Sequence, residues 1–140
     1  MFKKILYRLK RILYFIVSGK LIYISFFALF LITPLLFTKH TSELFEYNKM
    51  MFVYALTVVI TGSWVLRMIS QRQVIFRRTP LDIPLGLFLI SQIISTIFSI
   101  DPHTSVWGYY SRSNGGLLSI ISYLLLYWAF VSNFEKEDAL

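Results

Sequence analysis

Long uncharged apolar runs constrain this chain more than any other feature of its sequence. The run from Leu21 to Thr38 and the run from Ile83 to Ile100 contain no charged residue. Since an α-helix rises about 1.5 Å per residue, about 20 such residues cross the roughly 30 Å hydrocarbon core of a bilayer. The hydrophobic share of 56% and the mean hydropathy of +0.65 agree with these runs in predicting a membrane protein.

The expected fold is an all-α membrane protein with four transmembrane helices, preceded by a basic amphipathic interfacial helix. In residues 1–18, basic and apolar side chains separate onto two faces of a helix, so this segment is expected to lie on membrane lipid. The rest of the chain, 19–140, forms one membrane region. Its predicted spans are about 21–38, 50–66, 83–100 and 117–134.

The placement of Lys and Arg predicts the orientation, because basic loops are retained on the cytoplasmic side. With the N-terminus inside, only Lys39, Lys49 and Arg112 of the 14 Lys and Arg residues fall in outer segments. We therefore expect a multi-pass protein with its N-terminus and C-terminus both cytoplasmic, and with 101–116 facing outward. The basic segment 67–78 is interpreted as a cytoplasmic turn rather than a nucleic-acid-binding surface.

The third predicted span has a recognisable start and a polar face. Thr79 and Asp82 have the spacing of a capping box, and Pro80 stands at the first helical position. Small polar side chains then recur at helical spacing, and we expect this polar stripe to face into a helix bundle rather than lipid. The stripe consists of Ser91, Gln92, Ser95, Thr96 and Ser99.

The outward segment 101–116 begins with a predicted turn. Pro102 cannot continue a helix and pushes Asp101 out of the helical region, so the third span is expected to end there. Thr104 or Ser105 is then expected to cap a short interfacial turn. His103 is interpreted as a solvated turn residue and receives no role.

The same segment contains a candidate binding site for a lipid-linked phosphate or diphosphate. The guanidinium of Arg112 has the planar fork that grips phosphate, helped by backbone N–H groups at the start of the next helix. Gly108 and Gly115 let a ligand approach the main chain. Trp107 and Tyr110 carry rings that stack on sugars. An alternative stays open, in which Arg112 contacts bulk lipid phosphate and the aromatic residues belong to an interfacial belt.

The composition also limits the chemistry. The chain has no cysteine, which excludes disulfides and thiolate nucleophiles. It has two histidines, His40 and His103, far apart in the sequence, so no metal site and no cofactor are expected.

Two motifs in Thr79 to Trp128 point to a family. A span ends in the pattern S-x-D-P and is followed by an outer loop of pattern G-x-x-x-R-x-x-G. The matching residues are Ser99, Asp101 and Pro102, then Gly108, Arg112 and Gly115. The run resembles the amino-terminal part of O-antigen ligase and O-antigen polymerase-like membrane proteins.

The resemblance implies a metal-independent glycosyltransferase of the bacterial cytoplasmic membrane. Such a protein transfers glycan from an undecaprenyl diphosphate carrier at the outer face. The family's catalytic Arg and His lie in a large outer loop between later spans, and this chain ends before any such loop. We therefore assign no catalytic residue and expect the N-terminal portion of a larger polytopic protein, which binds the lipid-linked glycan. The alternative is a small non-catalytic membrane scaffold or regulatory subunit that uses the polar stripe.

Overall fold

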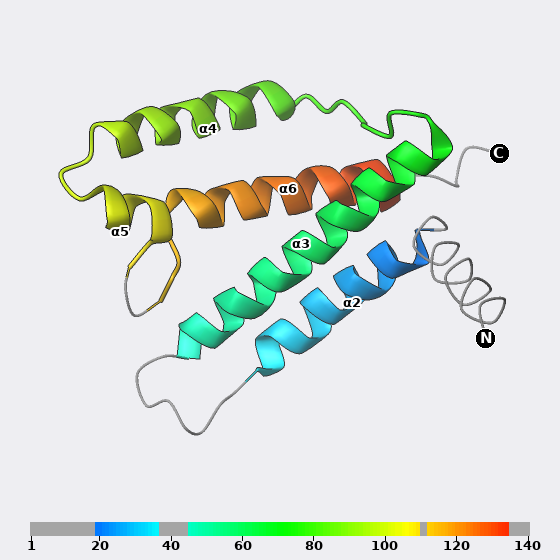
Figure 1. Cartoon of the computed structure of the whole chain (residues 1–140), viewed down its shortest axis with the longest axis horizontal. Helices are drawn as coiled ribbons and strands as arrows, with labels where there is room; N and C mark the ends of the chain where they lie inside the picture. The colour runs from blue at the N-terminus through cyan, green and yellow to red at the C-terminus, as the bar shows by residue number, and fades with distance from the viewer. Residues whose placement is uncertain (1–18, 37–44, 110–111, 135–140) are drawn as a thin grey trace, which may run out of the picture.

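The computed structural model describes residues 19–36, 45–109 and 112–134, and all regular secondary structure in these ranges is helical. The described helices are α2 (Lys20–Leu35), α3 (Phe45–Gln71), α4 (Asp82–Ile97), α5 (Pro102–Trp107) and α6 (Leu117–Phe134). The four longer helices alternate in direction along the chain (Figure 1). The all-α prediction is confirmed for the described residues, whereas the predicted interfacial helix in 1–18 lies outside them.

Two of these helices are long and apolar enough to cross a membrane. Helix α3 has 27 residues and α6 has 18, and both are mainly apolar. Helices α2 and α4 have 16 residues each, which corresponds to about 24 Å of rise. The predicted span 117–134 coincides with α6, and the predicted span 50–66 lies inside α3.

The two shorter helices end before their predicted limits, and local side-chain chemistry explains both ends. Helix α2 stops at Leu35, one residue after Pro34, whose missing N–H leaves the carbonyl of Phe30 without its intrahelical partner and weakens the last turn. Helix α4 stops at Ile97 rather than continuing to residue 100. There the hydroxyl of Ser99 donates to the carbonyl of Asp101 at 3.1 Å and accepts from its N–H at 3.2 Å. These local bonds replace the next helical turn.

Helix α3 is the centre of the bundle and packs against both α2 and α6 (Figure 1). The buried apolar core joins Ile22 and Phe26 of α2 to Ile60 and Trp64 of α3, and Ala129 of α6 completes it. Three buried hydroxyls bond to carbonyls of their own helix. Thr57 donates to Val53 O at 2.7 Å, Ser63 to Val59 O at 2.6 Å and Ser122 to Leu118 O at 2.9 Å. Helices therefore approach closely without leaving these donors unpaired.

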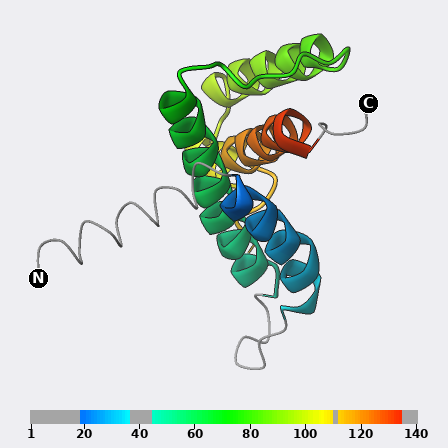
Figure 2. The same ribbon diagram turned by 90° about the vertical axis from the view of Figure 1, so that its right-hand side faces the viewer.

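Helix α4 lies on the opposite side of α6 from α2 and is attached only loosely (Figures 1 and 2). None of its residues is buried, and Ser91 and Ser95 of the polar stripe are exposed. Gln92, Thr96 and Ser99 of the same stripe are half-buried, so the expectation that the stripe faces into a bundle holds for these three residues and fails for Ser91 and Ser95. Among the described helices, α4 packs against α6 and α5, which cover only part of its surface.

The start of α4 is held to α6 by the predicted capping pair. The carboxylate of Asp82 accepts from the backbone N–H of Thr79 and from its hydroxyl, both at 2.8 Å. It also accepts from the indole N–H of Trp128 at 3.0 Å. The pairing of Thr79 with Asp82 is confirmed, although the helix begins at Asp82 itself. Because Trp128 lies well inside α6, α4 begins beside the middle of α6 (Figure 1).

The segment between α3 and α4, residues 72–81, is an extended connection rather than a tight turn. The indole N–H of Trp64 donates to Ile75 O at 2.9 Å. The ring of Phe76 lies between Trp64 and Trp128, with centroids 6.3 Å from each. The predicted turn also begins too early, because Arg67 still belongs to α3. These aromatic contacts hold this segment against α3 and α6.

The short helix α5 is capped by a residue other than the expected one. Asp101, not Thr104 or Ser105, is its N-cap, and its carboxylate accepts from the backbone N–H groups of His103 at 3.1 Å and Thr104 at 3.3 Å. Pro102 occupies the first turn, where a missing N–H costs nothing. The hydrogen bond from the Thr104 hydroxyl is the main reason that the pKa of Asp101 lies below its usual value.

This cap predicts how α5 responds to acid. A lowered carboxyl pKa means that Asp101 stabilises α5 above the ordinary aspartate pKa of about 3.9, and that this stabilisation is lost as the pH falls through the lowered value. The protection factors of the α5 amides in detergent micelles, which correct for the intrinsic pH dependence of exchange, are expected to fall across that acidic window in the wild type. Asp101→Asn keeps a capping oxygen but does not titrate, so its exchange should not show this step. An identical acid step in both proteins would contradict the assignment.

Candidate functional site

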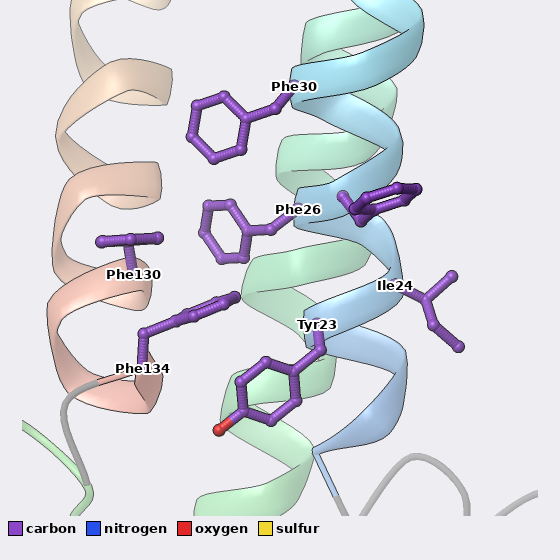
Figure 3. Close-up of a pocket in the computed structure, with 7 residues that line it drawn as sticks. Tyr23, Ile24, Phe26, Phe30, Phe130 and Phe134 are labelled. Carbon is purple, nitrogen blue, oxygen red and sulfur yellow. The ribbon is translucent and has the colours of Figure 1, made fainter. Parts of the chain in front are cut away.

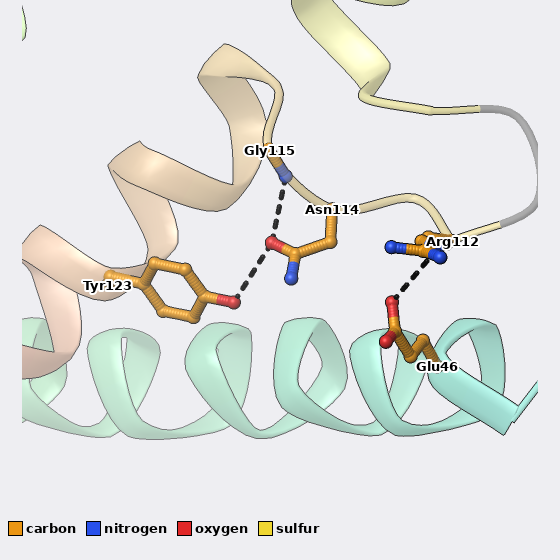
Figure 4. Close-up of polar contacts among 5 residues, drawn as sticks. All are labelled: Glu46, Arg112, Asn114, Gly115 and Tyr123. Carbon is orange, nitrogen blue, oxygen red and sulfur yellow. Dashed lines mark hydrogen bonds and ion pairs between the residues drawn. The ribbon is translucent and has the colours of Figure 1, made fainter.

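The end of the bundle that carries the predicted site brings two connecting segments together. Arg112, in the segment before α6, lies with its Nε 3.4 Å from a carboxylate oxygen of Glu46, in the first turn of α3 (Figure 4). The hydroxyl of Tyr54 donates to the carbonyl of Ser113 at 2.8 Å and fixes the same segment to α3. The two predicted outer segments therefore meet at one end of the molecule.

A cleft of about 520 Å³ opens at this ion pair. It is lined by Glu46, Tyr109, Arg112, Asn114 and Gly115. The side chains of Arg112 and Glu46 are 64% and 55% exposed, so water screens their attraction and the pair contributes little to stability. Within the described residues, the two terminal nitrogens of the guanidinium have no partner. Arg112 therefore presents free donors to anything that enters the cleft.

Asn114 organises the wall of the cleft nearest α6. Its side-chain oxygen accepts from the N–H of Gly115 at 2.8 Å and from the hydroxyl of Tyr123 at 3.2 Å (Figure 4). The N–H of Gly115 also donates to the hydroxyl of Ser119 at 3.1 Å. Since this N–H already has two acceptors, it is not available to an anion. The predicted help from backbone N–H groups does not extend to Gly115.

Gly108 has a structural task rather than a place in the cleft. Its φ of 83° and ψ of −173° belong to a region that only glycine adopts readily. It is buried, and a Cβ at this position would collide with the backbone of Asn114. A Cβ at Gly116 would likewise collide with the N of Gly108 and the O of Val106. The two glycines thus let the loop backbone cross itself just before α6.

The sequence-predicted site residues are only partly brought together. Arg112 and Gly115 line the cleft. Gly108 lies outside the lining, and its backbone packs closely against the backbone of Asn114. Trp107 is 52% exposed on α5, lies outside the cleft lining, and has its ring centroid 6.5 Å from that of His103. Tyr110 lies outside the described residues.

Three lining residues were missed by the sequence reasoning: Glu46, Tyr109 and Asn114. For Tyr109 the available signal was its position next to Gly108. No signal pointed to Glu46, because its pairing with Arg112 depends on how α3 crosses the loop before α6.

The site offers hydrogen bonding and charge rather than metal chemistry. Among the described residues, no group of three or more His, Cys, Asp or Glu side chains is placed to hold a metal ion. The arrangement suits an anionic ligand that takes the place of the Glu46 carboxylate at Arg112. Asn114 and Tyr109 can hydrogen-bond hydroxyl groups of the same ligand. No protein-family model, curated protein or solved structure matches the chain.

Two glycines in 101–116 share a positive φ and provide a matched test of the loop. Gly108 and Gly115 both have φ +83°, but a Cβ at Gly115 meets nothing within 4 Å. Gly115→Ala should lower the free energy of unfolding by about 1–2 kcal/mol, the cost of the left-handed backbone. Gly108→Ala should cost roughly 3 kcal/mol or more, because backbone must also move. Thermal unfolding in detergent measures both, and equal losses would contradict the crossing.

Proposed function

We propose that this chain is the N-terminal membrane portion of an O-antigen ligase or polymerase-like protein. In this proposal it handles undecaprenyl-diphosphate-linked glycan at the outer face of the bacterial cytoplasmic membrane. The sequence motifs around Asp101 and Arg112 suggest the family, and the cleft at Arg112 supplies a place for the diphosphate. Transfer itself is assigned to no residue of this chain.

Four membrane crossings are part of this proposal. They are supported by the alternating direction of α2, α3, α4 and α6, which puts successive connections at opposite ends of the bundle (Figure 1). Short α2 and α4 gain hydrophobic length from apolar flanks, such as the exposed Phe98 and Ile100 after α4. Lys20, Arg67 and Arg72 fall at the end opposite Arg112, as a cytoplasmic placement of that end requires.

The observation that carries the functional proposal is the state of Arg112. It is an exposed cation whose terminal nitrogens have no protein partner among the described residues, and its one counter-ion is a solvent-exposed carboxylate. A diphosphate brings more negative charge than Glu46 and matches the guanidinium fork. Asn114 and Tyr109 then lie beside the position of the first sugar, where amide and phenol groups bond sugar hydroxyls.

A second candidate function is a small non-catalytic membrane scaffold or regulatory subunit. The observation that favours it is the exposure of α4, which has no buried residue and leaves Ser91 and Ser95 uncovered. Small polar residues on a membrane helix favour close packing against another helix. The first candidate needs the cleft to bind a diphosphate, whereas the second does not.

Binding of undecaprenyl diphosphate to the purified chain in nanodiscs separates these candidates. Arg112→Gln should weaken binding by about ten- to a hundredfold, since hydrogen bonds to a charged group contribute about 1.5–3 kcal/mol. Glu46→Gln should strengthen binding, because it removes the carboxylate that competes for Arg112. Arg72→Gln, at the other end of α3, serves as the matched control and should bind as the wild type does. Unchanged affinity in the Arg112 and Glu46 variants would reject the diphosphate site.

A further inference from the structure

A second hollow lies between α2 and α6, toward the end of the bundle that carries Lys20. It is an open groove of about 520 Å³ with almost entirely apolar walls (Figure 3). The residues that line it are Tyr23, Ile24, Phe26, Phe27, Phe30, Phe130 and Phe134. The two helices make no extensive contact with each other, and aromatic rings fill part of the space between them.

Buried aromatic rings form the inner wall of the groove, and exposed aromatic rings border its open side. Phe26 is buried and packs edge-to-face on Phe130 at 5.5 Å and on Phe134 at 5.3 Å. Phe27 and Phe30, in contrast, are 68% and 64% exposed. A smaller hollow of about 260 Å³ shares Phe26, Phe30 and Phe130 and continues along α6 to Tyr123. The apolar surface is therefore a strip that follows the helices.

The end of the groove nearest the start of α2 is cationic. Arg67 Nη1 donates to the side-chain oxygen of Asn133 at 2.8 Å, and the hydroxyl of Tyr23 donates to the carbonyl of Asn133 at 2.8 Å. A Cβ on Gly19 would lie 2.9 Å from Arg67 Nη1, so the guanidinium rests against the backbone that begins α2. Within the described residues no carboxylate pairs with Arg67, and its buried Nε has no hydrogen-bond partner.

Lys20 adds a second positive charge on the side of α2 that faces the groove. It precedes Ile24 by four residues and Phe27 by seven, so these three residues share one face of the helix. Its side chain is exposed. Side chains of a helix lean toward the N-terminus, which directs Lys20 toward the end where Arg67 lies.

We propose that this groove binds an anionic glycerophospholipid of the inner leaflet. One acyl chain lies along the aromatic walls, and the headgroup phosphate contacts Lys20 and Arg67. The inference rests on the proposed membrane placement but not on carrier-lipid binding, which concerns the opposite end of the bundle. The positive charges of Lys20 and Arg67 lie at one end of the groove and the apolar walls extend away from them. A phospholipid has the same order, with its anionic headgroup at the membrane surface and its acyl chain deeper.

The arrangement of charge favours a lipid over another helix. Lys20 and Arg67 lie at one end of the groove, near the start of α2, and the apolar strip continues away from them along α6 to Tyr123. A lipid with one anionic headgroup and an apolar chain matches this one-sided charge.

Native mass spectrometry of the full chain tests this proposal. The protein is released from micelles that contain equal amounts of phosphatidylglycerol and phosphatidylcholine. One phosphatidylglycerol molecule should be retained in preference to phosphatidylcholine. Lys20→Gln should reduce this preference about fivefold, the effect of one Lys near an anionic headgroup. Lys49→Gln, its control near the start of α3 at the opposite end of the bundle, should leave the preference unchanged.

Blocking the groove provides the second arm. Ile24→Trp should abolish retention of the lipid, because the larger ring fills the space for the acyl chain. Ile90→Trp is the matched control, since Ile24 and Ile90 are both 54% exposed and Ile90 lies on α4, outside the groove. Circular dichroism verifies that each variant is folded.

Three results would overturn the proposal. They are equal retention of the two lipids by the wild type, retention that Ile24→Trp leaves intact, and a dimer of the chain that Ile24→Trp disrupts. Arg112→Gln distinguishes this proposal from the carrier-lipid site. That variant should keep the preference for phosphatidylglycerol even if it loses undecaprenyl diphosphate.

Discussion

The solvent around the helices is the constraint on which the rest of the structure depends. In hydrocarbon every backbone N–H and C=O must be paired within the chain, and helices meet this requirement segment by segment. The outer faces of these helices then become apolar, as the exposed Phe27, Ile83 and Phe98 illustrate at 68%, 75% and 83%. The two helices that are long and apolar enough to cross a membrane belong to a bundle with extensive exposed apolar surface, which fits a lipid environment. In the proposed membrane placement, lipid covers the apolar surface that the small core around α3 leaves exposed.

Apart from Asp82, which lies beside α6, the charged side chains of this frame gather toward the two ends, and the ends differ. At one end Arg67 and Asn133 join α3 to α6, and Lys20 adds charge beside an aromatic groove. At the other end Arg112 meets Glu46 over an open polar cleft. The proposals place an anionic lipid at the first end and a lipid-linked diphosphate at the second. Both rely on the same physical pairing of a guanidinium with phosphate at the edge of hydrocarbon.

Sequence alone predicted what depends on local pattern. The limits of α6 and the pairing of Thr79 with Asp82 both follow from neighbouring residues. The sequence did not predict contacts between residues that are distant in the chain. Glu46 is distant from Arg112 in the chain, and their contact depends on the crossing of α3 and α6. The exposure of Ser91 and Ser95 depends on the lack of a described helix beyond α4, which helical periodicity does not report.

The central claim is that the chain crosses the membrane, so that its two polar ends lie on opposite sides. The absence of native cysteine allows single cysteines to report this directly. His103 in α5 and Gln73 just after α3 are exposed residues that lie on either side of α4 in the chain. In intact bacterial protoplasts, a membrane-impermeant maleimide should modify His103→Cys and should reach Gln73→Cys only after permeabilisation. Modification of both cysteines in intact protoplasts, or of Gln73→Cys alone, would contradict the account.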